Sequence, residues 1–334
     1  MCLKSVPVID LSRFYAGGPD EMPRLIAEVR AACESIGFFL VKGHGVDEGL
    51  LEETLKATQH FFSLPVKDKL VIQQPAGGVP RGYTPFKGET LSAGLGKAAP
   101  ADLKEMIDIG PVDVPDGDYY HNQAARFYFH DNLWPPKPEN FRQVMEQYYR
   151  RMNSLANDLM ELFALALDLP RLFFADKLDK NISALRVICY PEQEYIPEPG
   201  QLRSGVHTDY GTLTILTSDQ VAGGLQALHR DGYWVDVDIE PGTYVVNIGD
   251  VMQMVTNEKW ISTLHRVVNP SADKASTSRR ISIPFFHQPN YDALIETLPS
   301  CLKQGQRSKY DPVTYLEHWN QKWSATRPSS NSAM

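Results

Sequence analysis

The chain has 334 residues, of which 43% are hydrophobic and 22% charged, and this composition is typical of a globular protein with ample material for a core. The formal net charge of −8 argues against nucleic acid as a partner. The sequence contains no run of about 18 apolar residues, so no membrane span is predicted. Four cysteines without CxxC spacing and a start without an apolar leader lead us to expect a reduced, cytoplasmic protein.

The first quarter of the chain alternates strand and helix patterns. The runs VPVIDLS and FFLVKGHG predict a short strand and a buried strand. Apolar residues at spacings of three and four predict a helix over residues 20–36 that ends at Gly37, and Asp47 is expected to cap a second helix that ends near Phe62. Between Pro75 and Pro138, glycine and proline are frequent, so we expect little regular structure there.

A long amphipathic helix is expected over residues 139–167, and its apolar stripe favours core packing over a cofactor channel. From residue 182 onward the pattern changes to short strand-like runs separated by turn residues, among them ALRVICY, TLTILTS, TYVVNIGD and RRISIPFF. Evenly spaced short strands favour a β-sandwich or barrel. The tail TRPSSNSAM is expected to be disordered.

Two His-x-Asp pairs occur in this second half of the chain. His229-Arg230-Asp231 precedes a glycine between two strand-like runs and predicts a hairpin turn; the residues that follow HRD in a kinase catalytic loop are missing. The other pair, His207 and Asp209, lies among strand signals. Residues two apart on a strand share a face, so these two side chains can reach one metal ion together.

A third ligand and an anion receptor follow on later strand-like runs. His265 lies in STLHRVV, and Arg280 and Ser282 share a face of RISIPFF. Taken singly, His265 could be a core histidine and Arg280 a surface ion-pair partner. Together with His207 and Asp209 they predict a metal held from one side, beside a guanidinium and hydroxyl that suit a carboxylate. Two histidines and a carboxylate with open positions suit Fe(II); zinc hydrolases also use this ligand set, but do not need the arginine.

The order of the motifs HTD, H and RIS along the chain resembles that of the iron(II)/2-oxoglutarate-dependent dioxygenases, most closely that of the isopenicillin N synthase-like branch. The resemblance extends over nearly the whole chain, from VPVIDLS through DLKEMIDIG to GVHTDYGTLTIL and RISIPFF. It implies a mostly β fold with flanking helices around a double-stranded β-helix (jelly-roll) core. The implied parts are an N-terminal α/β region (5–115), a connecting loop and long helix (116–179), the core (180–290) and a C-terminal extension (291–334).

The resemblance also implies roles for individual residues, with no catalytic residue beyond the metal ligands. The ligands of Fe2+ are then His207, Asp209 and His265. Arg280 and Ser282 bind the distal carboxylate of the cosubstrate 2-oxoglutarate, with a hydroxyl from Tyr190. The neighbouring Arg279 is a rival, although the Arg-x-Ser frame selects Arg280. Ile188 stands where plant members commonly have asparagine, so one polar contact is expected to be absent.

The implied reaction uses O2 to decarboxylate 2-oxoglutarate oxidatively and, through a non-haem ferryl oxidant, hydroxylates, desaturates or cyclises a small organic molecule. For the substrate pocket we expect Arg186, Phe285, His287 and the loop 77–96; because Phe285 and Phe286 alternate, one faces the core and the other can face the cavity. Two alternatives stay open: a 2-oxoglutarate-independent Fe(II) oxidase of the isopenicillin N synthase type, and a non-catalytic β-barrel binding protein. The prime substrate and the oligomeric state are not predicted.

Overall fold

A computed structural model describes residues 5–18, 20–75, 79–96, 99–193, 195–219 and 224–325. The helices are α1 (Ser12–Ala16), α2 (Glu21–Ser35), α3 (Glu48–Ser63), α4 (Val66–Lys69), α5 (Asp118–His121), α6 (Phe141–Ala166), α7 (Asp250–Val255) and α8 (Tyr315–Ala325). The first seven strands are β1 (Val8–Asp10), β2 (Phe38–Lys42), β3 (Gly82–Thr84), β4 (Glu105–Ile109), β5 (Ala184–Tyr190), β6 (Ser204–His207) and β7 (Leu213–Ser218). The others are β8 (Leu225–Leu228), β9 (Trp234–Asp236), β10 (Tyr244–Ile248), β11 (His265–Val267), β12 (Arg280–His287), β13 (Leu294–Ile295) and β14 (Val313–Thr314).

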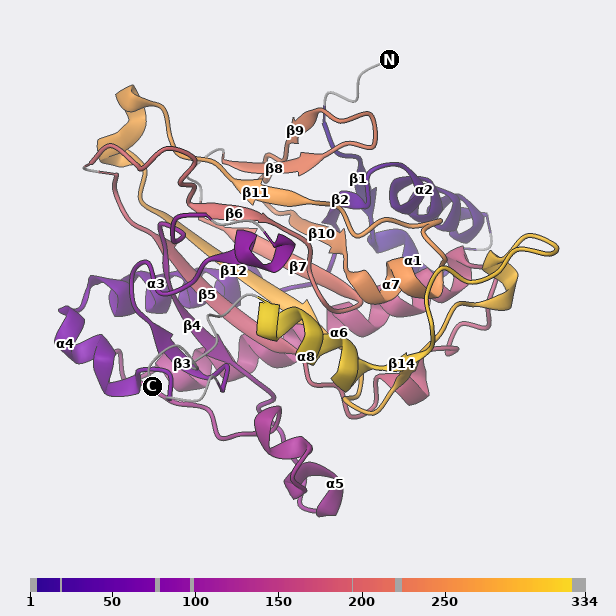
Figure 1. Cartoon of the computed structure of the whole chain (residues 1–334), viewed down its shortest axis with the longest axis horizontal. Coiled ribbons are helices and arrows are strands. Elements are labelled where there is room, and N and C mark those ends of the chain that lie inside the picture. The colour runs from indigo at the N-terminus through magenta and orange to yellow at the C-terminus, as the bar shows by residue number, and fades with distance from the viewer. Residues whose placement is uncertain are drawn as a thin grey trace.

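Two sheets form the body of the molecule (Figure 1). The larger has the strand order β1-β2-β10-β7-β12-β5-β4-β3, and the smaller has the order β6-β11-β8-β9. Within them, β1 and β2 are parallel and the remaining pairs are antiparallel. The expected jelly-roll core with flanking helices is therefore confirmed. Strands from both the N-terminal part and the core share the larger sheet, and the four-part division of the chain stays a prediction.

Strand periodicity divides the core into two layers. Phe38 and Val245 belong to a hydrophobic cluster between the sheets, whereas their neighbours Phe39 and Val246 belong to the cluster on the helical side. This follows because successive side chains on a strand point to opposite faces. Both faces of the central strands are buried, so these strands read as continuous apolar runs instead of alternating ones.

The long helix α6 covers the outer face of the larger sheet, between α2 and α3 (Figure 1). Its apolar residues recur at three- and four-residue spacing and form a buried stripe, as the sequence predicts. Phe163 of this helix packs edge-on against Trp260 at a centroid distance of 5.2 Å. Burying one such large apolar side chain contributes about 1.5–3 kcal/mol, so the stripe fixes the helix on the sheet.

Several local predictions are confirmed. Asp47 accepts a hydrogen bond from the Leu50 N–H at the start of α3. Gly37 follows α2 in the left-handed region at φ 67°, which glycine adopts without strain. His229-Arg230-Asp231 lies in the turn between the paired strands β8 and β9, where the Gly232 N–H donates to the His229 carbonyl. The tail 326–334 lies outside the described residues.

The expectation of little regular structure between Pro75 and Pro138 is wrong in part. Strands β3 and β4 lie there and extend the larger sheet, and all five residues of β4 are buried. The charged residues in β4 obscured the apolar pattern of a buried strand. One of them, Glu105, pairs with Lys69 at 2.6 Å and accepts a hydrogen bond from Tyr83. A buried carboxylate satisfied in this way is tolerated inside a sheet.

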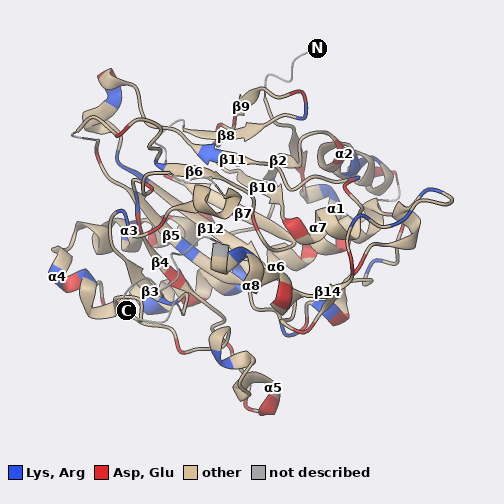
Figure 2. Cartoon of the chain, viewed as in Figure 1, with Lys and Arg blue, Asp and Glu red and all other residues tan. Residues whose placement is uncertain are grey.

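Figure 2 shows lysine and arginine interspersed with aspartate and glutamate along the drawn chain, with no side of the view given over to one sign. Among the helices of the described residues, none combines the length and the apolar character that crossing a membrane requires.

Candidate metal centre and cavity

The three predicted metal ligands lie at the adjacent ends of two paired strands. His207 ends β6 and His265 begins β11, and these two residues are directly opposite each other in the antiparallel register. Asp209 lies just beyond the end of β6, in the connection to β7, and not within a strand. The pairing of β6 with β11 brings together side chains that are far apart in the sequence.

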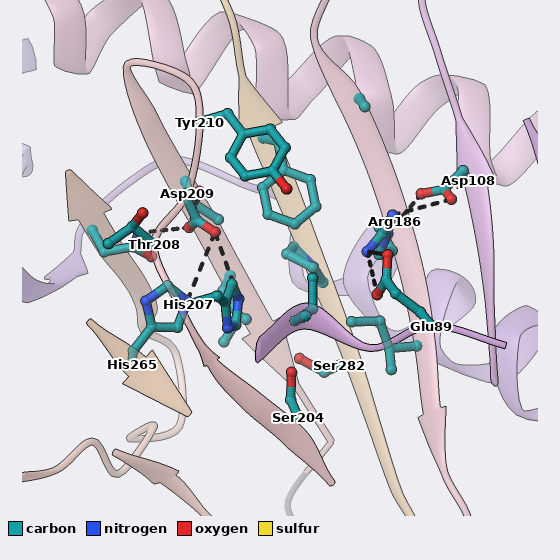
Figure 3. Close-up of a pocket in the computed structure, with 18 of the residues that line it drawn as sticks. Glu89, Asp108, Arg186, Ser204, His207, Thr208, Asp209, Tyr210, His265 and Ser282 are labelled. Atoms are coloured by element: carbon teal, nitrogen blue, oxygen red, sulfur yellow. Dashed lines mark hydrogen bonds and ion pairs between the residues drawn. The ribbon is translucent and has the colours of Figure 1, made fainter. Parts of the chain in front are cut away.

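The ligand atoms converge on one point (Figure 3). The Nε2 atoms of His207 and His265 are 3.9 and 3.7 Å from Oδ1 of Asp209, and all three ligand atoms lie within 4.8 Å of one another. Nδ1 of His207 donates to the Gly205 carbonyl at 2.7 Å, and Nδ1 of His265 donates to the Thr263 carbonyl at 3.0 Å. These bonds fix the tautomers, so both Nε2 lone pairs face the carboxylate and can bind a metal.

The carboxylate of Asp209 is oriented by two further side chains. Its Oδ2 accepts hydrogen bonds from Thr214 Oγ1 at 2.6 Å and from Asn247 Nδ2 at 2.7 Å, which leaves Oδ1 facing the histidines. Thr214 on β7 and Asn247 on β10 are register partners, so adjacent strands supply both donors. Sequence reasoning missed these two residues; Asn247 is a polar side chain in the otherwise apolar run YVVNI, whereas Thr214 lies in a strand with two other hydroxyl side chains.

The protonation states suit a metal site. Burial, and then the charge of His265, lowers the pKa of His207 to about 3, so its imidazole is neutral. Burial opposes ionisation of Asp209, but its electrostatic interaction with His265 and His207 and the hydrogen bonds from Thr214 and Asn247 outweigh it, and the pKa of Asp209 is lowered. Imidazole nitrogens and an ionised carboxylate are the donor set of a facial Fe(II) site with open positions.

A cavity extends from this centre between the two sheets. At its inner end, Arg280 and Ser282 on β12 line the cavity together with Tyr190, which is the register partner of Arg280 on β5. Arg280 is only 3% exposed, yet it makes no hydrogen bond or ion pair with any residue that the structure describes, and its Nε is buried without a partner. A buried cation without a partner is costly, so an anion bound here would offset that cost.

The rival Arg279 does not line this cavity. It neighbours Arg280 on the chain and therefore points to the other face of the sheet, where its charge partly offsets the burial that raises the pKa of the Cys189 thiol. The Arg-x-Ser frame therefore selects the arginine that faces the cavity.

The outer part of the cavity is lined by charged and aromatic side chains. Arg186 binds Asp108 through Nε at 2.7 Å and Glu89 through Nη1 at 3.1 Å, across the cavity from the metal ligands (Figure 3). Glu89 and Leu91 come from the loop 77–96, as expected, although residues 77 and 78 of this stretch lie outside the described residues. The aromatic side chains that line this part are Tyr128, Tyr210, Phe286, Trp319 and Trp323.

The assignment of Phe285 to the pocket is wrong. Phe285 is fully buried on the helical side of the sheet, where it packs edge-on against Tyr149 at 5.1 Å, and Phe286 faces the cavity instead. Strand alternation from Arg280 and Ser282, which line the cavity, places Phe286 on the same face of β12 and Phe285 on the opposite face.

The comparisons with known proteins agree with this geometry. Residues 6–137 match the N-terminal region of the non-haem dioxygenases in morphine synthesis, and residues 181–289 match the 2OG-Fe(II) oxygenase superfamily. A 2-oxoglutarate-Fe(II) type oxidoreductase of Emericella nidulans is 36% identical over 92% of this chain and 86% of its own. The chain belongs to the 2OG-Fe(II) oxygenase superfamily.

Other relatives of the oxygenase extend the comparison. A rice homoarginine-6-hydroxylase is 33% identical over 96% of both chains. Among solved structures, a full-length Neurospora crassa protein in complex with alpha-KG and thymine has a TM-score of 0.83 and 28% identity over 96% of each chain. A rice dioxygenase for auxin oxidation has a TM-score of 0.72 and 28% identity over 96% of this chain and 95% of its own. The oxygenase is therefore an enzyme that uses Fe(II) and 2-oxoglutarate. The comparisons support this function over the two alternatives, a 2-oxoglutarate-independent oxidase and a non-catalytic binding protein.

The assignment of His287 to the substrate pocket is also wrong. His287 is fully buried outside the cavity lining, where its Nδ1 is hydrogen-bonded with Thr212 Oγ1 at 2.8 Å. Burial lowers the pKa of His287 to about 3. The oxygenase thus keeps this histidine neutral inside its core.

A neutral buried histidine makes stability depend on pH. Because the folded pKa lies below the unfolded value of 6.5, the unfolded chain binds the extra proton and stability falls as pH drops below 6.5. At about pH 5 this one group costs about 2 kcal/mol. His287→Asn, which keeps a donor near Nδ1 but does not titrate, should reduce the acid-induced loss by about that amount, measured as urea midpoints at pH 7.5 and pH 5. An equal loss in both proteins would show that His287 titrates normally.

Proposed function

We propose that this oxygenase oxidises a small, uncharged, ring-shaped organic molecule at the aromatic outer part of its cavity. In this proposal the metal is held by His207, Asp209 and His265, while 2-oxoglutarate is held at the inner end by Arg280, Ser282 and Tyr190. The unpaired guanidinium of Arg280 is the observation that supports the second part, since the distal carboxylate of 2-oxoglutarate would supply its missing anion.

The chain's own residues orient the reactants. Fe(II), when bound, would supply the reduction of O2 that converts 2-oxoglutarate to succinate and carbon dioxide and oxidises a nearby C–H bond. The ligands occupy one side of the metal position, so the other side faces the cavity and the substrate. The anchored tail restricts 2-oxoglutarate to one direction along the cavity, which lowers the entropy cost of reaction.

The charges around the outer part of the cavity support an uncharged substrate. Lys104 binds Glu89 at 2.8 Å and Asp102 at 3.1 Å, and Arg186 binds Glu89 and Asp108. Both of these cations are thus paired with acids, whereas the guanidinium of Arg81, which also lines the cavity, donates to backbone carbonyls. A charged substrate would have to displace one of these buried pairs, which is costly.

The aromatic side chains support a ring-shaped substrate. Phe286 lies with its ring 5.8 Å from the Arg186 guanidinium, and Trp319 and Trp323 stack on each other at 4.6 Å. Flat apolar surfaces of this kind bind flat rings by stacking and exclude water. Relatives point to both kinds of substrate, because the Neurospora crassa protein was solved with thymine, whereas the plant hydroxylases are named for homoarginine, a charged amino acid.

A substrate screen tests the proposal. Purified oxygenase with Fe(II), ascorbate and 2-oxoglutarate is incubated with uncharged rings such as thymine, and with the charged compounds homoarginine and auxin. We expect succinate formation to rise above the uncoupled rate only with uncharged rings. Turnover of homoarginine alone would contradict the substrate class. Oxygen uptake that does not depend on 2-oxoglutarate would contradict the assigned cosubstrate.

A cytoplasmic location also stays a proposal. The free thiols of Cys33, Cys189 and Cys301 support it, since unpaired cysteines are typical of a reducing compartment.

A further inference from the structure

The C-terminal helix α8 contacts both the metal-binding segment and the substrate part of the cavity. On the face of α8 that points into the molecule, side chains four residues apart line up in two rows, one along each edge of that face. His318 and Lys322 form the polar edge, and Tyr315, Trp319 and Trp323 form the aromatic edge. In Figure 1 this helix crosses in front of the larger sheet near β12.

The polar edge holds the residues on either side of Asp209. Lys322 Nζ donates to Thr208 Oγ1 at 2.9 Å, and His318 Nε2 is hydrogen-bonded with the Tyr210 carbonyl at 3.2 Å. Lys322 also pairs with the carboxylate of Asp250 at 2.8 Å. The backbone N–H of Asp250 in turn donates to the carbonyl of Asp209 at 2.8 Å, so Lys322 acts on the Asp209 backbone from two directions.

These contacts matter because Asp209 lies outside the strands. His207 and His265 are fixed by the pairing of β6 with β11, but residues 208–210 follow the end of β6 and have no strand partner among the described residues. Thr214 and Asn247 orient the carboxylate of Asp209, whereas its backbone depends on Asp250 and on the neighbours that α8 holds. Side chains that orient a metal ligand from outside its coordination sphere commonly affect metal affinity by 10–100-fold.

The aromatic edge of α8 faces the substrate part of the cavity. Trp319 is buried and packs edge-on against Tyr128 at 5.4 Å and Phe127 at 5.0 Å. Trp323, one position after Lys322, stacks on Trp319 and lines the cavity. Consecutive residues of one helix thus contact the metal-binding segment and the substrate part of the cavity.

We propose that Lys322 is a positioning residue for the metal centre and that Trp323 is a specificity-determining residue for the substrate. Lys322 acts through Thr208 and Asp250 to place Asp209, and it touches neither metal nor substrate. The proposal requires the metal site but not the substrate class proposed above, so each can fail without the other.

Anaerobic titration with Co(II) alone tests the role of Lys322, because the visible absorption of bound Co(II) reports both affinity and coordination geometry. Lys322→Met, which keeps the length of the side chain but loses its charge, should bind Co(II) about tenfold more weakly and change the spectrum. Lys322→Arg should restore most of the affinity. Lys56→Met, on the exposed face of α3, is the matched control and should bind Co(II) as the parent does.

Two further variants separate positioning from packing. Thr208→Val keeps the shape of the side chain but removes the hydroxyl that Lys322 binds, so it should weaken Co(II) binding in the same direction. Trp323→Ala should leave Co(II) affinity within about twofold of the parent and raise KM for the prime substrate at least about tenfold. Unchanged Co(II) binding in both Lys322→Met and Thr208→Val would overturn the role of Lys322. An unchanged KM in Trp323→Ala would overturn the role of Trp323.

Discussion

Asp209→Ala is expected to abolish turnover without unfolding the protein, and His207→Ala is expected to do the same. Asp209 supplies the only carboxylate among the three ligands, and its Oδ1 is the atom on which both imidazoles converge. Without it, two imidazole ligands remain, which bind a divalent ion weakly and leave its charge uncompensated. We expect at least about a 1,000-fold loss of 2-oxoglutarate-dependent succinate formation, equal to about 4 kcal/mol of transition-state stabilisation.

The fold should survive this change. Thr214 and Asn247 lose their acceptor, which costs about 1–3 kcal/mol for each donor left unpaired. The change also removes a buried charge, and this offsets part of the cost. Circular dichroism should therefore show a folded protein with a moderately lower melting temperature.

The second His-x-Asp pair of the chain provides the matched control. His229 lies 3.5 Å from Asp231 in the hairpin between β8 and β9, and its ring stacks on Tyr233 at 4.6 Å. His229→Ala therefore makes the same chemical change as His207→Ala, in the same kind of tripeptide but away from the metal centre. It should retain parental succinate formation. Activity retained in Asp209→Ala, or lost in His229→Ala, would refute the ligand assignment.

The residues whose chemistry is unusual for their position were predictable from the sequence. Histidine and aspartate among strand signals, and an arginine followed by a serine two positions later, are costly in a core unless something binds them. The spacing of such residues therefore indicated the proposed metal ligands and the proposed anion receptor. The Arg-x-Ser frame of the resemblance selected Arg280 over Arg279, and the structure places Arg280 in the cavity.

The errors on β12 could have been avoided from the sequence. Strand alternation from Arg280 and Ser282 puts Phe286 on the cavity face and puts Phe285 and His287 on the opposite face, as the structure shows. β4 was missed because its acids are paired with distant cations. The role of α8 could not be predicted from the sequence, because Lys322 and Thr208 are 114 residues apart and no local pattern around either residue indicates their contact.

Arg280→Ala is expected to raise KM for 2-oxoglutarate by about 100-fold or more. Each hydrogen bond to a charged group contributes about 1.5–3 kcal/mol, and about 1.4 kcal/mol is a factor of ten, so losing a two-pronged guanidinium contact accounts for this change. Turnover at saturating 2-oxoglutarate should fall much less, because the metal ligands are untouched. The measurement is succinate formation as a function of 2-oxoglutarate concentration at fixed prime substrate.

The effect of Arg280→Ala on thermal stability should depend on whether 2-oxoglutarate is present. In the absence of 2-oxoglutarate, Arg280 is a buried cation without an ion-pair partner among the described residues, and burial lowers its pKa. Removing it should leave the melting temperature of the ligand-free protein unchanged or higher. The same change should abolish the rise in melting temperature that 2-oxoglutarate causes in the parent. Arg279→Ala removes the adjacent guanidinium on the opposite face and should keep both the KM and the 2-oxoglutarate-induced rise. If Arg279→Ala and Arg280→Ala exchanged these results, the anion receptor would be Arg279, and the orientation of β12 relative to the cavity would have to be reversed.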